Sequence, residues 1–261
     1  MTGLLVAACG LLGLLVGSFL NVVVHRVPAG LSVVRPRSSC PPCGRPVAAR
    51  DNVPVVSWLL LRGRCRHCAA PVSVRYPLVE LATGLAFAAL AAVTGPAAYL
   101  PALLLLAGAG VALFVIDLEH QRLPFAITAT AGMGCSLLLL LDVWVRGPQP
   151  LPGALLAAVL WLAVYGGIWL ATAGRGMGLG DVALAPVLGL VLGWLGWGST
   201  VTGLLAGFVI GAVVGLGLVA FAGAGRRASV PHGPFMLAGA GLGLAVGGDL
   251  WRAYLGVTGL A

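Results

Sequence analysis

Residues 97–116 read AAYLPALLLLAGAGVALFVI, a stretch of twenty residues without a charge. A helix needs about 20 apolar residues to cross a bilayer, so this stretch predicts a membrane-spanning helix. The rest of the chain has the same character, because 60% of its 261 residues are hydrophobic and only 8% are charged. Soluble domains carry roughly 25% charged residues. The alternating pattern of a membrane β-barrel is absent, so helices are expected throughout.

The same criterion finds eight apolar runs along the chain. Two of their boundaries are inferred from breaks inside longer apolar stretches, at Gly95-Pro96 and at 197–199. The sequence therefore predicts an all-α polytopic membrane protein of about eight transmembrane helices. The eight runs are 1–24, 77–93, 97–116, 124–141, 151–173, 182–197, 200–222 and 234–248.

The distribution of the fifteen basic residues, all of them arginines, indicates the orientation of these helices. Eight spans place four loops on one side of the membrane, and those loops hold thirteen arginines, whereas the other side holds Arg146 and Arg252. Positive residues stay in the cytosol, so both termini are expected outside. The basic balance thus indicates cytosolic loops, and no nucleic-acid partner is expected. The four loops are 25–76, 117–123, 174–181 and 223–233.

This topology divides the chain into three parts. The first helix, 1–24, has no basic segment before its apolar run, so it is expected to be retained rather than removed as a signal peptide. Residues 25–76 form a cytosolic loop domain. Residues 77–261 form a seven-helix membrane core.

The loop domain contains two C-x-x-C pairs, Cys40 with Cys43 and Cys65 with Cys68. Four thiolates at this spacing suit a tetrahedral zinc ion, and a four-cysteine site leaves no open position for chemistry. The reducing cytosol disfavours disulfides. We therefore predict a structural zinc site, with a redox-active pair and idle thiols as the alternatives.

Among the aspartates near the membrane, only Asp117 and Asp181 fall at the cytosolic ends of spans, where they can meet. Glycines alternate before the second, with Gly178 and Gly180 nearest to it, and this flexible run can place the carboxylate in a non-helical loop. Two facing carboxylates can share one proton, so that one activates water and the other protonates the leaving group. Glu119 is a candidate supporting residue. The alternative is that each aspartate only caps a helix or marks the interface.

Taken in order along the chain, five motifs resemble the prepilin leader peptidases, also called type IV prepilin peptidases, of the GxGD aspartyl protease class. The resemblance extends nearly from end to end, and it places the two catalytic aspartates of that family on Asp117 and Asp181. The motifs are GSFLNVVVHRVP at 17–28, the two C-x-x-C pairs, RYPLVEL at 75–81, the two aspartate segments, and PHGPF at 231–235.

The resemblance implies an enzyme of the inner membrane that cleaves the leader peptide of type IV prepilins or type II secretion pseudopilins on the cytosolic side. It also implies N-methylation of the new terminus with S-adenosylmethionine, an activity of the long-form members that carry the cysteine loop. Glu80 and Asn21 are candidate residues of a methyl-transfer site.

Three residues depart from the family pattern: Phe125 stands where an acid is usual, Ala183 where a lysine is frequent, and His232 where a phenylalanine is usual. None of them removes a predicted catalytic carboxylate, but they bear on substrate positioning. Two other function classes fit the composition. One is a transporter that uses the aspartates as a proton relay, and the other is a zinc-loop scaffold without catalysis.

Overall fold

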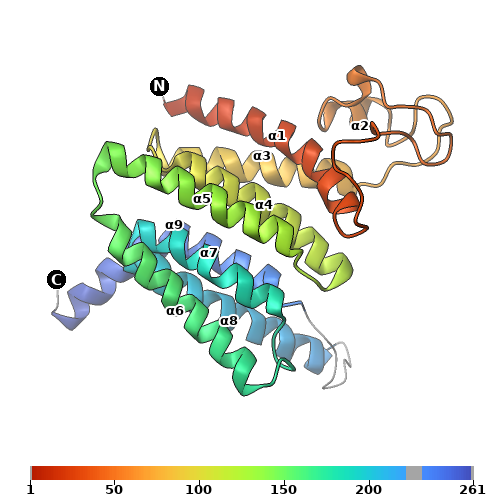
Figure 1. The fold of residues 1–261 in the computed structure, drawn as a ribbon. Coiled ribbons are helices and arrows are strands. Elements are labelled where there is room, and N and C mark those ends of the chain that lie inside the picture. Colours follow the sequence, from red (N-terminus) through yellow and green to blue (C-terminus); the bar gives the residue numbers. More distant parts are fainter. Residues whose placement is uncertain (1, 222–230, 260–261) are drawn as a thin grey trace. The chain divides into compact units, whose positions relative to one another are not determined.

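The computed structural model describes residues 2–221 and 231–259, and within them the regular structure is helical, with no β-strand. Two short pieces, η1 (Ala49–Asp51) and α2 (Val56–Leu60), lie in the first loop. The others are long helices (Figure 1): α1 (Thr2–Arg26), α3 (Arg75–Thr94), α4 (Leu100–His120), α5 (Phe125–Arg146), α6 (Pro150–Ala171), α7 (Leu179–Leu195), α8 (Trp197–Phe221) and α9 (Gly233–Thr258).

Each predicted apolar run forms a helix, which confirms the all-α polytopic membrane fold. Seven of the helices are long and apolar enough to cross a membrane. The eighth, α7, has 17 residues and is therefore about 26 Å long, slightly less than the roughly 30 Å hydrocarbon layer. Residue 222, the predicted end of the run 200–222, lies outside the described residues. The same holds for most of the predicted loop 223–233, including Arg226 and Arg227.

The two inferred helix breaks both form, one of them displaced by a residue. The first is at Gly95, which has a positive φ of 63° and caps α3. The second was expected at 197–199, but it falls at Gly196, which has a φ of 123°. Glycine adopts positive φ without steric cost, so the chain turns there and α8 can begin directly at Trp197.

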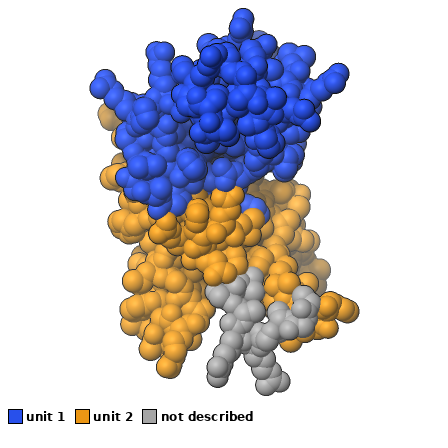
Figure 2. Space-filling view, turned by 90° about the vertical axis from the view of Figure 1, so that its right-hand side faces the viewer, with its two compact units in different colours: residues 1–115 blue, residues 116–261 orange. Residues whose placement is uncertain are grey.

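The chain forms two compact units, Met1–Val115 and Ile116–Ala261, drawn in different colours in Figure 2. In the first unit, α1 packs along α3 through glycines (Figure 1). A Cβ added at Gly13 would lie 2.6 Å from the carbonyl oxygen of Thr83, and one at Gly17 would lie 2.7 Å from the Cα of Glu80. Small residues allow this backbone approach, which is a common way for membrane helices to associate.

In the second unit, α6 packs against α7, and α8 packs against α9, again through small residues. A Cβ added at Gly189 of α7 would lie 2.6 Å from the carbonyl oxygen of Ala157 on α6. A Cβ at Gly247 of α9 would lie 2.7 Å from the carbonyl oxygen of Gly198 on α8. The high glycine content is therefore used at helix contacts as well as in loops.

A buried carboxylate joins α5 to α7 at the end of these helices that was predicted to lie outside. Asp142 accepts hydrogen bonds from Trp194 Nε1 at 2.8 Å and from Arg146 at 2.6 Å and 2.8 Å. A buried charge is costly unless it is paired and hydrogen-bonded, and Oδ2 of this carboxylate accepts all three of these bonds. These contacts give Asp142 a structural role in helix packing.

Candidate active site and metal centre

The two C-x-x-C pairs form turns with the same hydrogen bonds. In the first, the Cys40 N–H donates to the Arg45 carbonyl at 2.9 Å, and the Gly44 N–H donates to the Cys40 carbonyl at 2.8 Å. In the second, Cys65 is bonded in the same way to Ala70, at 2.8 Å, and to Ala69, at 2.9 Å. The residue four positions after the first cysteine has a positive φ in both turns, 68° and 57°. The pairs are thus two copies of one knuckle.

The knuckles bring their four sulfurs together. All four lie within 4.8 Å of one another, and the sulfurs of Cys40 and Cys68 are 3.7 Å apart. A zinc–sulfur bond of about 2.3 Å in a tetrahedron implies sulfur–sulfur distances of about 3.8 Å, so this donor set fits zinc. His67, inside the second knuckle, is exposed, and its Nδ1 lies 3.2 Å from Arg45 Nη1.

The ionisation of the thiols is consistent with a cation site. Hydrogen bonds from the backbone N–H groups of Cys68 and His67 lower the pKa of the Cys65 thiol to about 6. The pKa of Cys40 is raised to about 12, because a lowering hydrogen bond from the Cys43 N–H is outweighed by desolvation and the neighbouring thiols. Four sulfurs this close therefore resist joint ionisation, and a bound cation would favour the fully deprotonated set.

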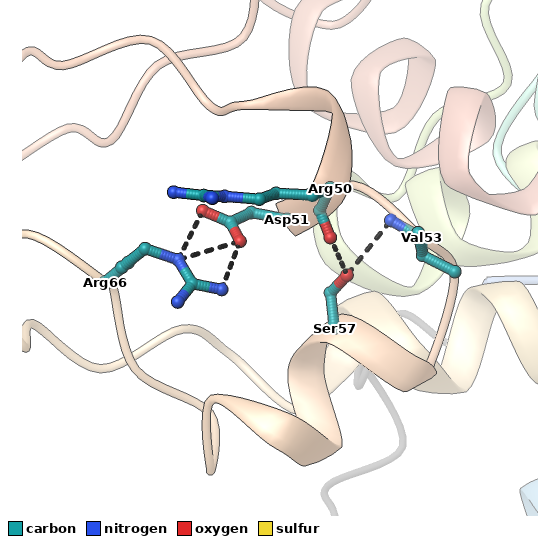
Figure 3. Close-up of polar contacts among 5 residues, drawn as sticks. All are labelled: Arg50, Asp51, Val53, Ser57 and Arg66. Atoms are coloured by element: carbon teal, nitrogen blue, oxygen red, sulfur yellow. Dashed lines mark hydrogen bonds and ion pairs between the residues drawn. The ribbon is translucent and has the colours of Figure 1, made fainter.

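The segment between the knuckles is fixed by polar contacts (Figure 3). Arg66 binds the Asp51 carboxylate with two nitrogens, at 2.6 Å, 2.9 Å and 3.0 Å, which lowers the pKa of that carboxyl. The Ser57 hydroxyl donates to the Arg50 carbonyl and accepts from the Val53 N–H, both at 3.0 Å. These contacts connect η1, α2 and the second knuckle.

A cavity of about 680 Å³ lies within the first unit, between this loop and the ends of α1 and α3. Its lining includes both residues predicted for methyl transfer, Asn21 and Glu80, together with His25, Trp58 and Tyr76. Cavities of roughly 300–1,000 Å³ are typical of small-molecule sites. The structure thus brings the two predicted residues to one cavity.

Both of these residues are buried, and some of their polar atoms form hydrogen bonds with the backbone of other residues. The Glu80 carboxylate accepts a hydrogen bond from the Val55 N–H at 2.7 Å. The Asn21 side-chain nitrogen donates to the carbonyls of Gly17 and Tyr76, at 3.3 Å and 3.1 Å. The Asn21 Oδ1 atom is buried and has no hydrogen-bond partner among the described residues.

The two predicted catalytic aspartates both lie in the second unit, and both are buried. Asp117 is in the last turn of α4 and accepts a hydrogen bond from the Gly233 N–H at 3.1 Å. Asp181 is in the first turn of α7 and accepts one from the Gly178 N–H at 3.1 Å. The expectation of a non-helical loop at Asp181 was wrong. Gly178 is the N-cap of α7 and Gly180 already lies in its first turn, so the carboxylate belongs to the helix.

The structure brings these two carboxylates near each other through shared packing on Leu123. A Cβ at Gly180, beside Asp181, would lie 2.8 Å from Leu123 Cβ. A Cβ at Gly233 would lie 3.1 Å from the Leu123 side chain and 2.7 Å from an Asp117 oxygen. Leu123 thus packs beside the segments that carry both carboxylates. Side chains at these glycines would disturb the supports of both aspartates.

Other predicted residues lie around this pair. Glu119 is exposed near the end of α4, and its supporting role stays a prediction. Phe125, at the start of α5, is 72% exposed, so this departure from the family pattern leaves an apolar ring outside the packed helices. The contributions of Gly233 and Leu123 were not predicted from sequence. Gly233 lies inside the motif 231–235, which gave a signal, whereas Leu123 gave none.

Comparison with known proteins accounts for most of the chain. Residues 11–94 match the bacterial peptidase A24 N-terminal domain, and residues 104–216 match the type IV leader peptidase family. No solved structure matches.

Relatives cover nearly the full length. The chain is 36% identical to the prepilin leader peptidase/N-methyltransferase of Aeromonas hydrophila, over 94% of this chain and 92% of the relative. It is 35% identical to that of Pseudomonas putida, over 95% and 93%, and 42% identical to that of Myxococcus xanthus (strain DK1622), over 83% and 64%. With identity of this extent and two matched domains in order, the chain belongs to the type IV leader peptidase family.

Proposed function

We propose that this chain is a membrane aspartyl endopeptidase that cleaves the leader from type IV prepilins or pseudopilins and then N-methylates the new terminus. The names of its relatives support both activities. The observation that carries the peptidase assignment is the pair of buried carboxylates, Asp117 and Asp181, each of which accepts a hydrogen bond from a glycine N–H beside Leu123.

The chemistry follows from this pair. The ionised carboxylate accepts a proton from water as the water oxygen bonds to the peptide carbonyl carbon. The protonated carboxyl group then donates its proton to the leaving nitrogen as the carbon–nitrogen bond breaks. The hydrogen bonds from Gly178 and Gly233 keep the two carboxylates oriented.

We propose the orientation that the arginines favour, with the protein in the inner membrane, both termini outside, and the loop domain 25–76 and the aspartates facing the cytosol. Seven candidate spans and the shorter α7 are consistent with this topology. The division into a first helix 1–24 and a membrane core 77–261 remains part of the proposal.

The cysteine cluster would hold zinc as a structural ion, with Cys40, Cys43, Cys65 and Cys68 as its ligands. Its donor set is complete, so it leaves no position for substrate. Between residues 27 and 74, only Ser57 and Gly63 are buried, and the loop therefore has no apolar core of its own. A bound ion would supply the stability that burial does not.

The test of the whole assignment is a prepilin co-expressed with the wild-type chain. The expected product lacks its leader and has gained the mass of one methyl group, as measured by mass spectrometry and N-terminal sequencing. An untouched prepilin, with solute uptake by the protein in proteoliposomes, would instead favour the transporter interpretation. Cleavage that persists after loss of either aspartate would show that the pair is not the catalytic group.

The methyl-transfer site that we propose is the cavity of the first unit. S-adenosylmethionine, when bound, supplies an electrophilic methyl group on a positively charged sulfur. Glu80 offers a buried carboxylate toward such a ligand or toward the substrate amine, and Asn21 belongs to the same lining. The volume of about 680 Å³ suits a ligand of this size.

The variant Glu80→Gln tests this site. Glutamine keeps an oxygen that can accept the Val55 N–H, so the loop should stay attached while the charge is lost. We expect the methylated fraction of product to fall about tenfold or more, because hydrogen bonds and ion pairs to a charged group contribute about 1.5–3 kcal/mol. The extent of leader removal in the same sample, read from the product mass, should stay within about twofold of the wild type. It serves as the internal control. Equal loss of both activities would contradict a separate site.

A further inference from the structure

Tyr165 is a fully buried side chain on α6, in the same unit as the two aspartates. Its ring stacks on Trp161, with centroids 5.9 Å apart, and on Phe208 of α8, with centroids 5.2 Å apart. The ring is therefore held in one orientation by neighbours on two helices. If this ring only filled space in an apolar span, phenylalanine would pack there equally well.

The Tyr165 hydroxyl is buried and has no hydrogen-bond partner among the described residues. Leaving a buried polar group unpaired costs about 1–3 kcal/mol, so such groups are rare unless another role retains them. Functional sites are one such role, because a group that is unpaired in the free enzyme can be paired in the substrate complex.

The position of this hydroxyl points to the peptidase site. The next residue on α6, Gly166, faces α7, because a Cβ added there would lie 3.9 Å from Cγ1 of Val182, the residue after Asp181. On its other side, the Tyr165 ring lies 5.8 Å from the ring of His232. His232 directly precedes Gly233, whose N–H binds Asp117. Tyr165 thus contacts the surroundings of both carboxylates.

A second unpaired polar atom belongs to the same cluster. The Nε2 atom of His232 is buried and also has no partner in the described part of the chain. Trp161 Nε1, on the ring stacked against Tyr165, is unpaired as well, so three neighbouring rings carry buried polar atoms without a partner among the described residues.

We propose that Tyr165 is a further residue of the peptidase site, whose hydroxyl donates a hydrogen bond to a backbone oxygen of the bound substrate next to Asp181. This inference rests on the proposed peptidase function and extends it. Aspartates accept and deliver protons, but the peptide oxygen becomes more negative as water adds to the carbonyl carbon. A neutral donor fixed beside that oxygen stabilises the transition state, and removing one such donor typically slows the reaction by about a hundredfold or more.

The substitution Tyr165→Phe separates this role from a role in folding. It keeps the stacked ring and removes only the unpaired hydroxyl, so the melting temperature of the purified, full-length protein should stay the same or rise. We expect kcat for prepilin cleavage to fall about a hundredfold or more, with KM within about threefold. The matched control is Tyr254→Phe, the same change on the exposed far part of α9, which should leave kcat and melting temperature unchanged.

Two results would overturn the inference. One is a kcat within twofold of the wild type, which would make the hydroxyl an idle group. The other is a lower kcat accompanied by a lower melting temperature, which would assign the hydroxyl to the fold. Aspartate variants measured in parallel keep the two proposals apart. If they are inactive while Tyr165→Phe is normal, only the role of Tyr165 fails; if they are active, the proposed function itself fails.

Discussion

Asp117→Asn and Asp181→Asn are each expected to reduce prepilin cleavage by at least about a thousandfold, because neither variant retains two groups that can exchange a proton. Asparagine has the shape of aspartate, and its oxygen can still accept the hydrogen bond from Gly233 or from Gly178. The change therefore removes charge and acidity while the local contacts remain.

The same variants should insert and fold normally. A buried carboxylate loses solvation on folding, and a neutral amide avoids this cost, so the melting temperature should not fall. The measurement is the rate of leader removal by purified wild-type and variant proteins at equal concentration, beside their thermal unfolding. The matched control is Asp249→Asn, whose carboxylate is exposed and paired with Arg252 near the other end of α9. It should cleave at the wild-type rate.

Cleavage by both active-site variants at the wild-type rate would refute the dyad. Loss in only one of them would show that a single carboxylate acts, with some other group as its partner. The combined variant adds a further check. Residues that act as a unit are strongly non-additive, so the double substitution should be barely slower than either single one.

Removal of the metal from the cysteine cluster is expected to unfold the loop domain. Structural zinc contributes about 10–16 kcal/mol in zinc-finger peptides, more than the stability of most small domains. The packing of the loop cannot replace this stabilisation, because no apolar side chain is buried between residues 27 and 74. Wild-type protein should contain one zinc ion per chain by elemental analysis, and Cys65→Ser should contain none.

Trypsin offers a direct readout, because it cuts after arginine and residues 25–76 hold nine arginines. The loop should resist trypsin in the wild type and be cut rapidly in Cys65→Ser or after chelation. The controls are Cys9→Ser and Cys135→Ser, since these two thiols are buried in α1 and α5, away from the cluster. Both should keep their zinc and their resistant loop.

The same digestion tests the orientation. Chelated protein in inside-out vesicles should be cut in the loop, whereas protein in right-side-out vesicles should be protected by the membrane. Zinc-free wild-type protein with an equally resistant loop would contradict a structural metal. It would leave the four cysteines as a redox-active pair or as idle thiols.

Much of this architecture could be predicted from the sequence because it depends on local composition. Apolar runs of about 20 residues predict helices by length alone, and every predicted run became one. The spacing of the cysteines predicted their convergence, since each knuckle is a short turn whose hydrogen bonds lie within six residues. Alternation of loops between two sides singled out Asp117 and Asp181 before any geometry was known.

The tertiary structure decided what depends on contacts between distant segments. Gly178 caps α7, so Asp181 lies in a helix where sequence indicated a loop. The Gly233 N–H reaches Asp117 across 116 positions of sequence, and Leu123 packs against the glycines beside both carboxylates. In sequence, Tyr165 resembles any aromatic residue of an apolar span, and only the packing of α6 against α7 and α8 leaves its buried hydroxyl unpaired. Hydropathy and spacing report the surroundings of a residue along the chain, whereas these contacts depend on how separate helices pack.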